Sequence, residues 1–408
     1  MVESNVRRRR KVNENSPTSN NPTRQEIEPK RLWLNFTLTV TATFITVCAY
    51  GYYTSPIKAV EIVGIKQIPM EGRFALNDKL SKGKRVPLPG PESIAEGGDG
   101  KLYTGLADGR VVCIHPSNDG EIGAGKVENI TTGVIEGAVN TSDAWRHGRP
   151  LGIRLRNQSL YVMDAIYGFY VIDLPTKSLK ILIEPDDVTP PMKFPDDFDI
   201  TADGTTVYFT DCSTKYTLPE LLTQFLEGSC TSRLIKYDML TQKLDVVKDG
   251  LCFGNGVQLI DDESMVIVTE STYYRVNWID TKTWEIKHVL HLPIMPDNVR
   301  SNSRGTYWIA GAFRQNFALW IMFRFLILRQ IIMSLVSEAA IMSSTDMYHG
   351  MAIEINSVGE IIQTLHDQQG ALTFGLTQTT EISDGRLALG SFTSHVLAIV
   401  DSSWSSDA

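Results

Sequence analysis

Side chains that carry carboxylate or amide oxygens recur in four stretches that otherwise resemble buried strands. They are Glu92 in "GPESIAEGG", Asp196 and Asp197 in "FPDDFDIT", Asn255 in "FGNGVQL", and Asp297 and Asn298 in "MPDNVR". Oxygen ligands without cysteine or histidine suit a hard cation, and Ca²⁺ takes about six to eight of them in irregular geometry. Each residue alone could be a turn residue that caps its own backbone. Their recurrence at one register favours a shared Ca²⁺ site.

The elements around these residues repeat along the chain. A hairpin of two short apolar strands, such as "LYVMDAIYGFYVIDL" from Leu160, follows a further strand and occurs six times at spacings of roughly 40 to 80 residues. Four strands per unit around a ring predict an all-β fold, a six-bladed β-propeller over residues 90–402. Because innermost strands line the channel of a propeller, separate blades would deliver the oxygen ligands to one point on its axis.

The N-terminal region has two parts of opposite character. Residues 1–31 are polar and basic, which predicts a disordered cytoplasmic tail. Residues 32–53 carry no charge and are long enough for a bilayer core, so we expect a transmembrane signal anchor whose partner is the lipid bilayer; a buried core helix is the alternative. The basic flank should stay in the cytosol, which predicts a single-pass type II protein of the endoplasmic reticulum or plasma membrane with a lumenal or extracellular propeller. Residues 54–89 would be a linker with a first strand region, and residues 403–408 a tail.

Composition and modification signals agree with a secretory location. The 408-residue chain has a formal net charge of −8, which argues against nucleic acid as its main partner. Three glycosylation acceptors lie beyond the anchor: Asn129, Asn140 and Asn157. Four of the five cysteines also lie there, and Cys212 and Cys230, the closest pair, are the first disulfide candidate. The alternative is that all four are small buried apolar side chains.

An apolar segment at about residues 313–345 interrupts the fifth blade. Arg324 and Arg329 make a second spanning helix costly. We therefore expect a helical insertion that lies on one face of the propeller and closes the core as a lid. A second interpretation is that its apolar side also contacts the bilayer or a lipophilic substrate.

Many motifs in order give the chain a family resemblance. "GPESIAEGGDGKLYTGLADGRVV", "GRPLGIRLRNQSLYVMDAIYGFYVIDL", "DGLCFGNGVQL", "PDNVR", "GTYWIA" and "LHDQQG" resemble the strictosidine synthase-like family, over residues 55–400. Its wider superfamily includes paraoxonases and gluconolactonases, calcium-dependent propeller hydrolases of esters and lactones. The paraoxonase calcium ligands correspond to Glu92, Asn255, Asp297 and Asn298 here. Asp196 stands where that pattern has another asparagine.

The resemblance also shows departures at catalytic positions. Leu151 stands where paraoxonases have a catalytic histidine. Gln378 stands at the position of the plant synthase's acidic residue, with Glu381 nearby but out of step. The first functional hypothesis is a calcium-dependent hydrolase of small lipophilic aryl esters or lactones, in which Asp196 or Asp197 orients water. The second is a non-catalytic binding propeller with structural calcium, and the third is carbon–nitrogen condensation of the synthase kind.

Overall fold

The structure is a computed structural model that describes residues 29–133, 147–343, 348–401 and 404. The chain divides into two units, residues 1–50 and 51–408. In the first, helix α1 (Pro29–Tyr53) begins, and residues 30–53 are long and apolar enough to cross a membrane. The predicted anchor therefore lies within one helix. Most of the two predicted tails lies outside the described residues.

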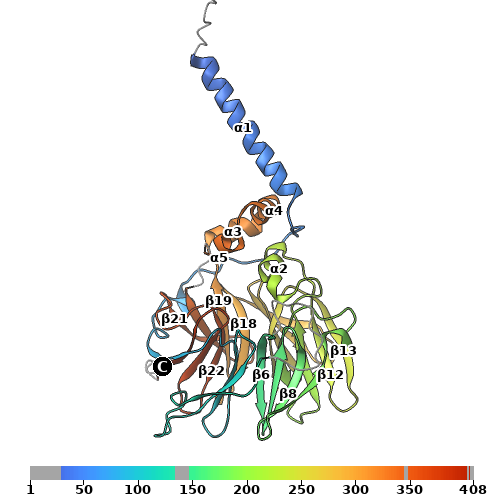
Figure 1. The fold of residues 1–408 in the computed structure, drawn as a ribbon, viewed down its shortest axis with the longest axis vertical. Coiled ribbons are helices and arrows are strands. Elements are labelled where there is room, and N and C mark those ends of the chain that lie inside the picture. The colour runs from blue at the N-terminus through green and yellow to red at the C-terminus, as the bar shows by residue number, and fades with distance from the viewer. Residues whose placement is uncertain (1–28, 134–146, 344–347, 402–403, 405–408) are drawn as a thin grey trace, which may run out of the picture. The chain divides into compact units, whose positions relative to one another are not determined.

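The second unit contains six antiparallel sheets of four strands each (Figure 1). The first three sheets consist of β2 (Ile94–Glu96), β3 (Leu102–Gly105), β4 (Val111–Ile114) and β5 (Val127–Asn129); β6 (Pro150–Arg156), β7 (Ser159–Asp164), β8 (Gly168–Asp173) and β9 (Ser178–Ile183); and β10 (Pro195–Ile200), β11 (Thr206–Asp211), β12 (Ser232–Asp238) and β13 (Lys243–Leu251). The next two consist of β14 (Gly254–Ile260), β15 (Met265–Glu270), β16 (Arg275–Asp280) and β17 (Ile286–His291); and β18 (Ile294–Ser301), β19 (Tyr307–Arg314), β20 (Gly350–Ile355) and β21 (Ile361–Asp367). The last contains β22 (Leu376–Glu381), β23 (Leu387–Ser391), β24 (Val396–Val400) and β1 (Gly83–Pro87).

The sheets close into a ring, which confirms the predicted six-bladed propeller. The first strands of successive sheets, β2, β6, β10, β14, β18 and β22, contact one another in a circle. The last blade is completed by β1, which comes from the predicted linker and pairs with β24, with Lys84 opposite Ile399. Because the two ends of the propeller share one sheet, this pairing closes the ring and covers the outer edge of β24. Apolar side chains from facing sheets fill the spaces between blades.

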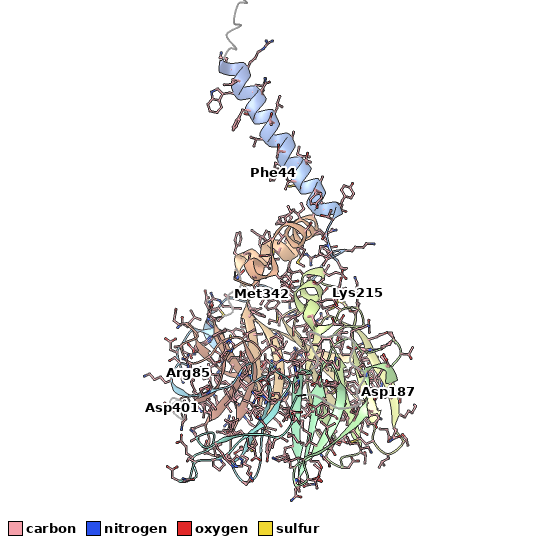
Figure 2. The ribbon with its side chains drawn as sticks, viewed as in Figure 1. Phe44, Arg85, Asp187, Lys215, Met342 and Asp401 are labelled. Atoms are coloured by element: carbon pink, nitrogen blue, oxygen red, sulfur yellow. A yellow bond between two sulfur atoms is a disulfide. The ribbon has the colours of Figure 1, made fainter. Side chains whose placement is uncertain are left out.

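Helices gather at one face of the ring (Figure 1). The predicted insertion forms α3 (Phe317–Arg324), α4 (Leu326–Leu335) and α5 (Glu338–Ser343) between β19 and β20 of the fifth blade. The short helix α2 (Leu221–Glu227), between β11 and β12, packs beside them through Phe225 and Leu226. Figure 2 shows Met342 and Lys215 at this helix-covered end. The insertion therefore packs on the propeller, as expected for a lid.

The disulfide differs from the predicted one. Cys230 pairs with Cys252, whereas Cys212 is free and buried. The reason is strand pairing: Ser232 lies opposite Leu251 in β12 and β13, which brings the two cysteines that flank these residues together. Cys212 directly follows β11, and its Sγ lies 3.0 Å from Asp196 Oδ2 instead. Sequence distance alone could not give the pairing, because pairing follows the sheet.

Two of the three predicted glycosylation acceptors lie in the described residues. Asn129 ends β5 and is exposed, and its Oδ1 accepts a hydrogen bond from Arg110. Asn157 is exposed at the β6–β7 turn. Asn140 lies outside the described residues. Both described asparagines are therefore accessible, and their glycosylation stays a prediction.

Candidate functional site: a ring of oxygen ligands in the channel

The same irregularity occurs in four innermost strands. In β6, β10, β14 and β18, two residues oppose one residue of the neighbouring strand, between Pro150 and Ile153 in β6 and between Pro195 and Phe198 in β10. Such β-bulges locally disrupt the ladder and re-aim side chains. The four bulged pairs are Leu151–Gly152, Asp196–Asp197, Asn255–Gly256 and Asp297–Asn298. Except for Glu92, which precedes β2, the predicted metal-site residues thus lie in a repeated bulge that the sequence pattern did not reveal.

One residue of each innermost segment lines a pocket at the helix-covered end of the channel. We call this set the pocket ring: Glu92, Leu151, Asp196, Asn255, Asp297 and Thr377. Four of its members are predicted site residues, and the structure brings them to one cavity. Leu151 and Thr377 complete the ring. Thr377 was not among the predicted residues; the resemblance pointed to its neighbour Gln378 as the counterpart of the synthase's acidic residue.

Above the ring the pocket is apolar. Its volume is about 140 Å³, and its walls come mostly from aliphatic and aromatic side chains. Phe194 and Phe253 contribute from the blades, α2 contributes Phe225, and the insertion contributes Leu319 and Met342. Ligand pockets usually combine such apolar walls with a few convergent polar groups. The arrangement therefore suits a lipophilic molecule with one polar group directed at the ring.

Several oxygens at the floor have no hydrogen-bond partner within the described part of the chain. They are Glu92 Oε2, Asn255 Oδ1 and Asn298 Oδ1, all fully buried. Asn298 Nδ2 donates to Glu92 Oε1 at 2.8 Å, which directs the remaining oxygens of both side chains elsewhere. Buried polar atoms are rarely left unpaired, since each costs about 1–3 kcal/mol. The set fits a bound cation with oxygen ligands.

Carboxylates alone would not hold a metal here. Among the described residues, no three aspartate, glutamate, histidine or cysteine side chains form a metal-binding group. A cation would need the amide oxygens of Asn255 and Asn298 as well as the carboxylates. Mixed carboxylate and amide ligation is typical of Ca²⁺.

The electrostatics of the ring also favour a cation. Burial raises the pKa of Glu92 well above its usual value, and Asp196 adds to the rise. Burial raises the pKa of Asp297 in the same way, with further contributions from Glu92 and Asp196. The pKa of Asp196 is raised to about 7, again mainly by burial, although a hydrogen bond from the Cys212 thiol opposes the rise. A divalent cation beside Glu92, Asp196 and Asp297 would stabilise the charged form of these carboxylates.

Residues one or three positions further along the same inner segments behave differently. We call them the channel network: Ser93, Arg154, Asp197, Arg300 and Gln378. Asp197 Oδ2 accepts from Arg300 Nη1 at 2.8 Å and from Val257 N at 2.9 Å, and its Oδ1 accepts from Arg154 and Arg300. Burial alone would raise the pKa of Asp197, but the two arginines outweigh it and lower that pKa. Asp197 does not line the pocket, so its predicted role in orienting water is not supported by its position.

Close approach in the bulges requires glycine at two positions. A Cβ atom at Gly256 would lie 2.6 Å from the carbonyl oxygen of Asp297. One at Gly152 would lie 2.9 Å from Asp197 Oδ1. Both distances are too short for a side chain, so these glycines let neighbouring innermost strands pack tightly enough to form the ring.

The family's catalytic positions hold residues that cannot transfer protons. Leu151 lies in the pocket ring, 2% exposed, and packs with Phe194 and Phe253. Gln378 points away from the pocket: its Oε1 accepts from Ser93 Oγ at 2.5 Å, and its Nε2 donates to the Ile94 carbonyl at 2.6 Å. Glu381 forms an ion pair with Arg304. Thr377, and not Gln378, lines the pocket, and its hydroxyl donates to the Glu92 carbonyl at 2.8 Å.

The fold and the pocket define a class of protein: a six-bladed β-propeller with a ring of oxygen ligands at one mouth of its channel. A family model described as strictosidine synthase matches residues 196–282, and one described as strictosidine synthase-like, N-terminal, matches residues 72–114. The chain belongs to the strictosidine synthase-like family.

Relatives from animals and plants support the assignment. Adipocyte plasma membrane-associated protein of Rattus norvegicus is 34% identical over 341 residues, which cover 80% of this chain and 87% of that protein. Protein STRICTOSIDINE SYNTHASE-LIKE 10 of Arabidopsis thaliana is 32% identical over 327 residues, covering 76% of this chain and 85% of that protein. Similarity thus extends over most of each chain.

A more distant likeness concerns the fold alone. The X-ray structure described as that of a gluconolactonase aligns with a TM-score of 0.50 at 10% sequence identity. The alignment covers 78% of this chain and 91% of that one. It supports the propeller architecture.

Proposed function

We propose that this protein hydrolyses lipophilic aryl esters or lactones in the pocket above the ring, with Ca²⁺ at the floor. The single observation that carries the proposal is the set of unpartnered buried oxygens at the base of an apolar cavity. Glu92, Asp196, Asn255, Asp297 and Asn298 would hold the ion. When bound, the ion would supply positive charge beside the carbonyl oxygen of the substrate.

The chain's own residues would perform the remaining steps. Asp196 would accept a proton from water while the water oxygen attacks the carbonyl carbon. When the carbon–oxygen bond to the alcohol or phenol breaks, Asp196 would return that proton to the leaving oxygen. Ca²⁺ beside Asp196 would favour the charged carboxylate, which is the form that accepts the proton. Phe194, Leu151 and Phe253 would exclude other water and hold the apolar part of the substrate.

A second function is favoured by a specific observation, the apolar Leu151 in the pocket ring. The titratable side chains of the ring are Glu92, Asp196 and Asp297, and all three would be needed as calcium ligands. Such a pocket would bind a lipophilic molecule without reacting with it. In this alternative, calcium stabilises the ring and the pocket is a binding site. The third possibility, carbon–nitrogen condensation, loses support because Gln378 faces away from the pocket.

Aryl-ester turnover by the full-length protein in detergent decides between these functions. We expect turnover with Ca²⁺ and a loss of about 100-fold or more with chelator or in Asp196→Asn. Asp99→Asn, a change in an exposed turn, is the matched control and should retain full activity. Absent turnover, together with a calcium-dependent melting temperature, would establish the binding alternative. An equal rate of turnover with and without chelator would exclude a role for the metal.

The membrane anchor and its orientation belong to the same proposal. The apolar helix of residues 30–53, which is uncharged from Leu32 onward, and the exposed acceptors Asn129 and Asn157 support a single crossing with the propeller in the lumen or outside the cell. Glycosidase treatment of the protein from eukaryotic cells should increase its electrophoretic mobility. Asn157→Gln should reproduce part of that change. Unchanged mobility, combined with protease protection of the N-terminal tail, would reverse the orientation.

A further inference from the structure

The insertion presents an unusual concentration of exposed apolar side chains. Among the described residues beyond Tyr53, sixteen large apolar side chains are exposed, and six of them lie within residues 317–336. We call these six the apolar face: Phe317, Trp320, Phe325, Ile327, Leu335 and Val336. Scattered exposed apolar residues are normal on a soluble surface, but a cluster on two short helices indicates an interaction site.

The opposite side of the same helices is firmly packed. Leu319, Met322 and Phe323 of α3 and Met333 of α4 are buried in a cluster that includes residues of α2 and the blades. Arg329 is fully buried, and its guanidinium donates to the carbonyls of Leu226, at 3.1 Å, and Val60. The apolar face is therefore held in place by a docked helix pair.

The charge pattern indicates the chemistry of the partner. No aspartate or glutamate occurs from Gln315 to Ser337, and Arg324 is exposed at the end of α3. One carboxylate of an adjoining segment, Glu61, lines a groove with Trp320 and Arg324. Apolar side chains with tryptophan and arginine at the edge are typical of helices that lie in a bilayer interface.

The insertion also forms a hydrogen bond with the residue that follows α1. Thr54 directly follows the last residue of α1, and its Oγ1 lies 2.6 Å from Oγ of Ser334 in α4. Helices of 8 and 10 residues measure roughly 12 and 15 Å, and the two are bent by 111°, so together they do not make a straight span of a 30 Å core. Helices of this length and bend can lie in the surface of a bilayer without crossing it.

We propose that the apolar face lies in the interfacial layer of the same bilayer that α1 crosses, and that the pocket receives its ligand from that bilayer. The second part rests on the proposed function. Leu319 lines the pocket from α3, and Ile341 and Met342 line it from α5, so the insertion forms a pocket wall and carries the membrane contact. The separation between lipid and pocket is then about one helix diameter, roughly 10 Å. Ligands that partition into lipid would be favoured over equally reactive soluble ones.

Spin labels on the full-length protein in phosphatidylcholine vesicles test the contact. A cysteine replaces Ile327 in one variant and Val358, which is equally exposed on the fifth blade, in the control. Cys48 is replaced by serine, and the free cysteines Cys113 and Cys212 are buried. The label at 327 should collide severalfold more often with oxygen, relative to a water-soluble nickel chelate, than the label at 358. Equal ratios would overturn the proposal, as would dipolar coupling between labels at 327, which would indicate contact between two copies.

A paired charge variant separates this inference from the proposed function. Phe325→Glu with Ile327→Glu should lower turnover of a long-chain aryl ester in vesicles severalfold and leave a short-chain ester in detergent unchanged, because neither residue lines the pocket. Val358→Glu with Ile362→Glu is the matched control and should change neither rate. A buried label without any ester turnover would refute the proposed function alone. Turnover with a water-exposed label would refute the membrane contact alone.

Discussion

The pocket ring and the channel network take nearby positions in the same inner segments of the propeller, yet their polar groups have opposite surroundings. Asp196 and Asp197 are adjacent and both buried. The pKa of the first is raised to about 7, mainly by burial. The pKa of the second is lowered, because Arg154 and Arg300 outweigh the effect of burial. Because both residues are buried and adjacent in sequence, the difference between their pKa values comes from the partners that other blades supply.

The comparison shows how to separate groups that stabilise the fold from groups held ready for a ligand. A buried charge with two arginine partners contributes to a closed ring, and removal of one partner leaves the others uncompensated. A buried oxygen without a partner costs stability unless a ligand completes its contacts. By this criterion the channel network holds the blades together, and the pocket ring binds. The predictions below test that assignment.

The largest effect should come from removing Asp197. Asp197→Ala leaves Arg154 and Arg300 buried without their carboxylate, so we expect a loss of about 3–5 kcal/mol in the free energy of unfolding. Asp196→Ala in chelator should cost much less, since it removes negative charge from a site that has an excess of it. Chemical denaturation of the full-length protein in detergent measures both. Equal losses would break the distinction between ring and network.

Much of the fold was predictable because it rests on local patterns. The apolar hairpins, the turns between them and the uncharged segment after Arg31 each express a preference over a few residues, and together they gave the propeller and the helix. The disulfide was predicted wrongly. Cys230 and Cys252 meet only because β12 and β13 pair, which depends on register, and register is a tertiary property.

A buried histidine pair gives a third case, in which the partner is another imidazole. His349 Nε2 lies 2.8 Å from His366 Nδ1. Burial, His349 and Arg314 lower the pKa of His366 to about 4, against a small opposing effect of Asp78. The folded protein therefore binds this proton less readily than the unfolded chain, whose histidine has a pKa near 6.5. Stability should be fully present above about pH 6.5 and fall by about 3 kcal/mol as the pH decreases toward 4.

Melting curves between pH 4.5 and 7 check this dependence. His366→Gln should be less stable at pH 7 and should lose less stability on acidification than the wild-type protein. His115, which pairs with Glu128 on a partly exposed edge, provides the control substitution. Parallel curves for wild type and His366→Gln would show that this pair does not control the acid response.

Calcium should change the two regions differently. At 100 times its dissociation constant, Ca²⁺ should stabilise the wild-type protein by about 2.7 kcal/mol. Asp297→Asn should abolish that gain, and in chelator it should be at least as stable as wild type, because burial and the neighbouring carboxylates raise the pKa of Asp297. Calorimetry with calcium and with chelator gives both values. A calcium shift that survives in Asp297→Asn would place the ion elsewhere.

The candidate site was predictable only in part, for an identifiable reason. Glu92, Asn255 and Asp297 have chemically distinctive side chains at one register, and the structure brings them to one pocket. The partners of Asp197 lie in other blades, 43 and 103 residues away, so the sequence could not distinguish it from Asp196. In the last blade the pairing of β22 with β23 skips Thr377 alone, whereas the bulges of the other strands skip two residues, and Thr377 is the residue that lines the pocket.

The smallest predicted effect concerns Thr377, which belongs to the pocket ring by position but has a partner. Its hydroxyl donates to the backbone carbonyl of Glu92, so Thr377→Val should cost about 1 kcal/mol, the net value of one neutral hydrogen bond. Because that hydroxyl is already engaged, the calcium-dependent rise in melting temperature should stay as large as in wild type. Thr379→Val, on the same strand but outside the pocket, is the matched control. If Thr377→Val removes the calcium-dependent rise in melting temperature, the Thr377 hydroxyl turns from the Glu92 carbonyl to the ion. In that case, the lack of a hydrogen-bond partner does not identify which oxygens bind calcium.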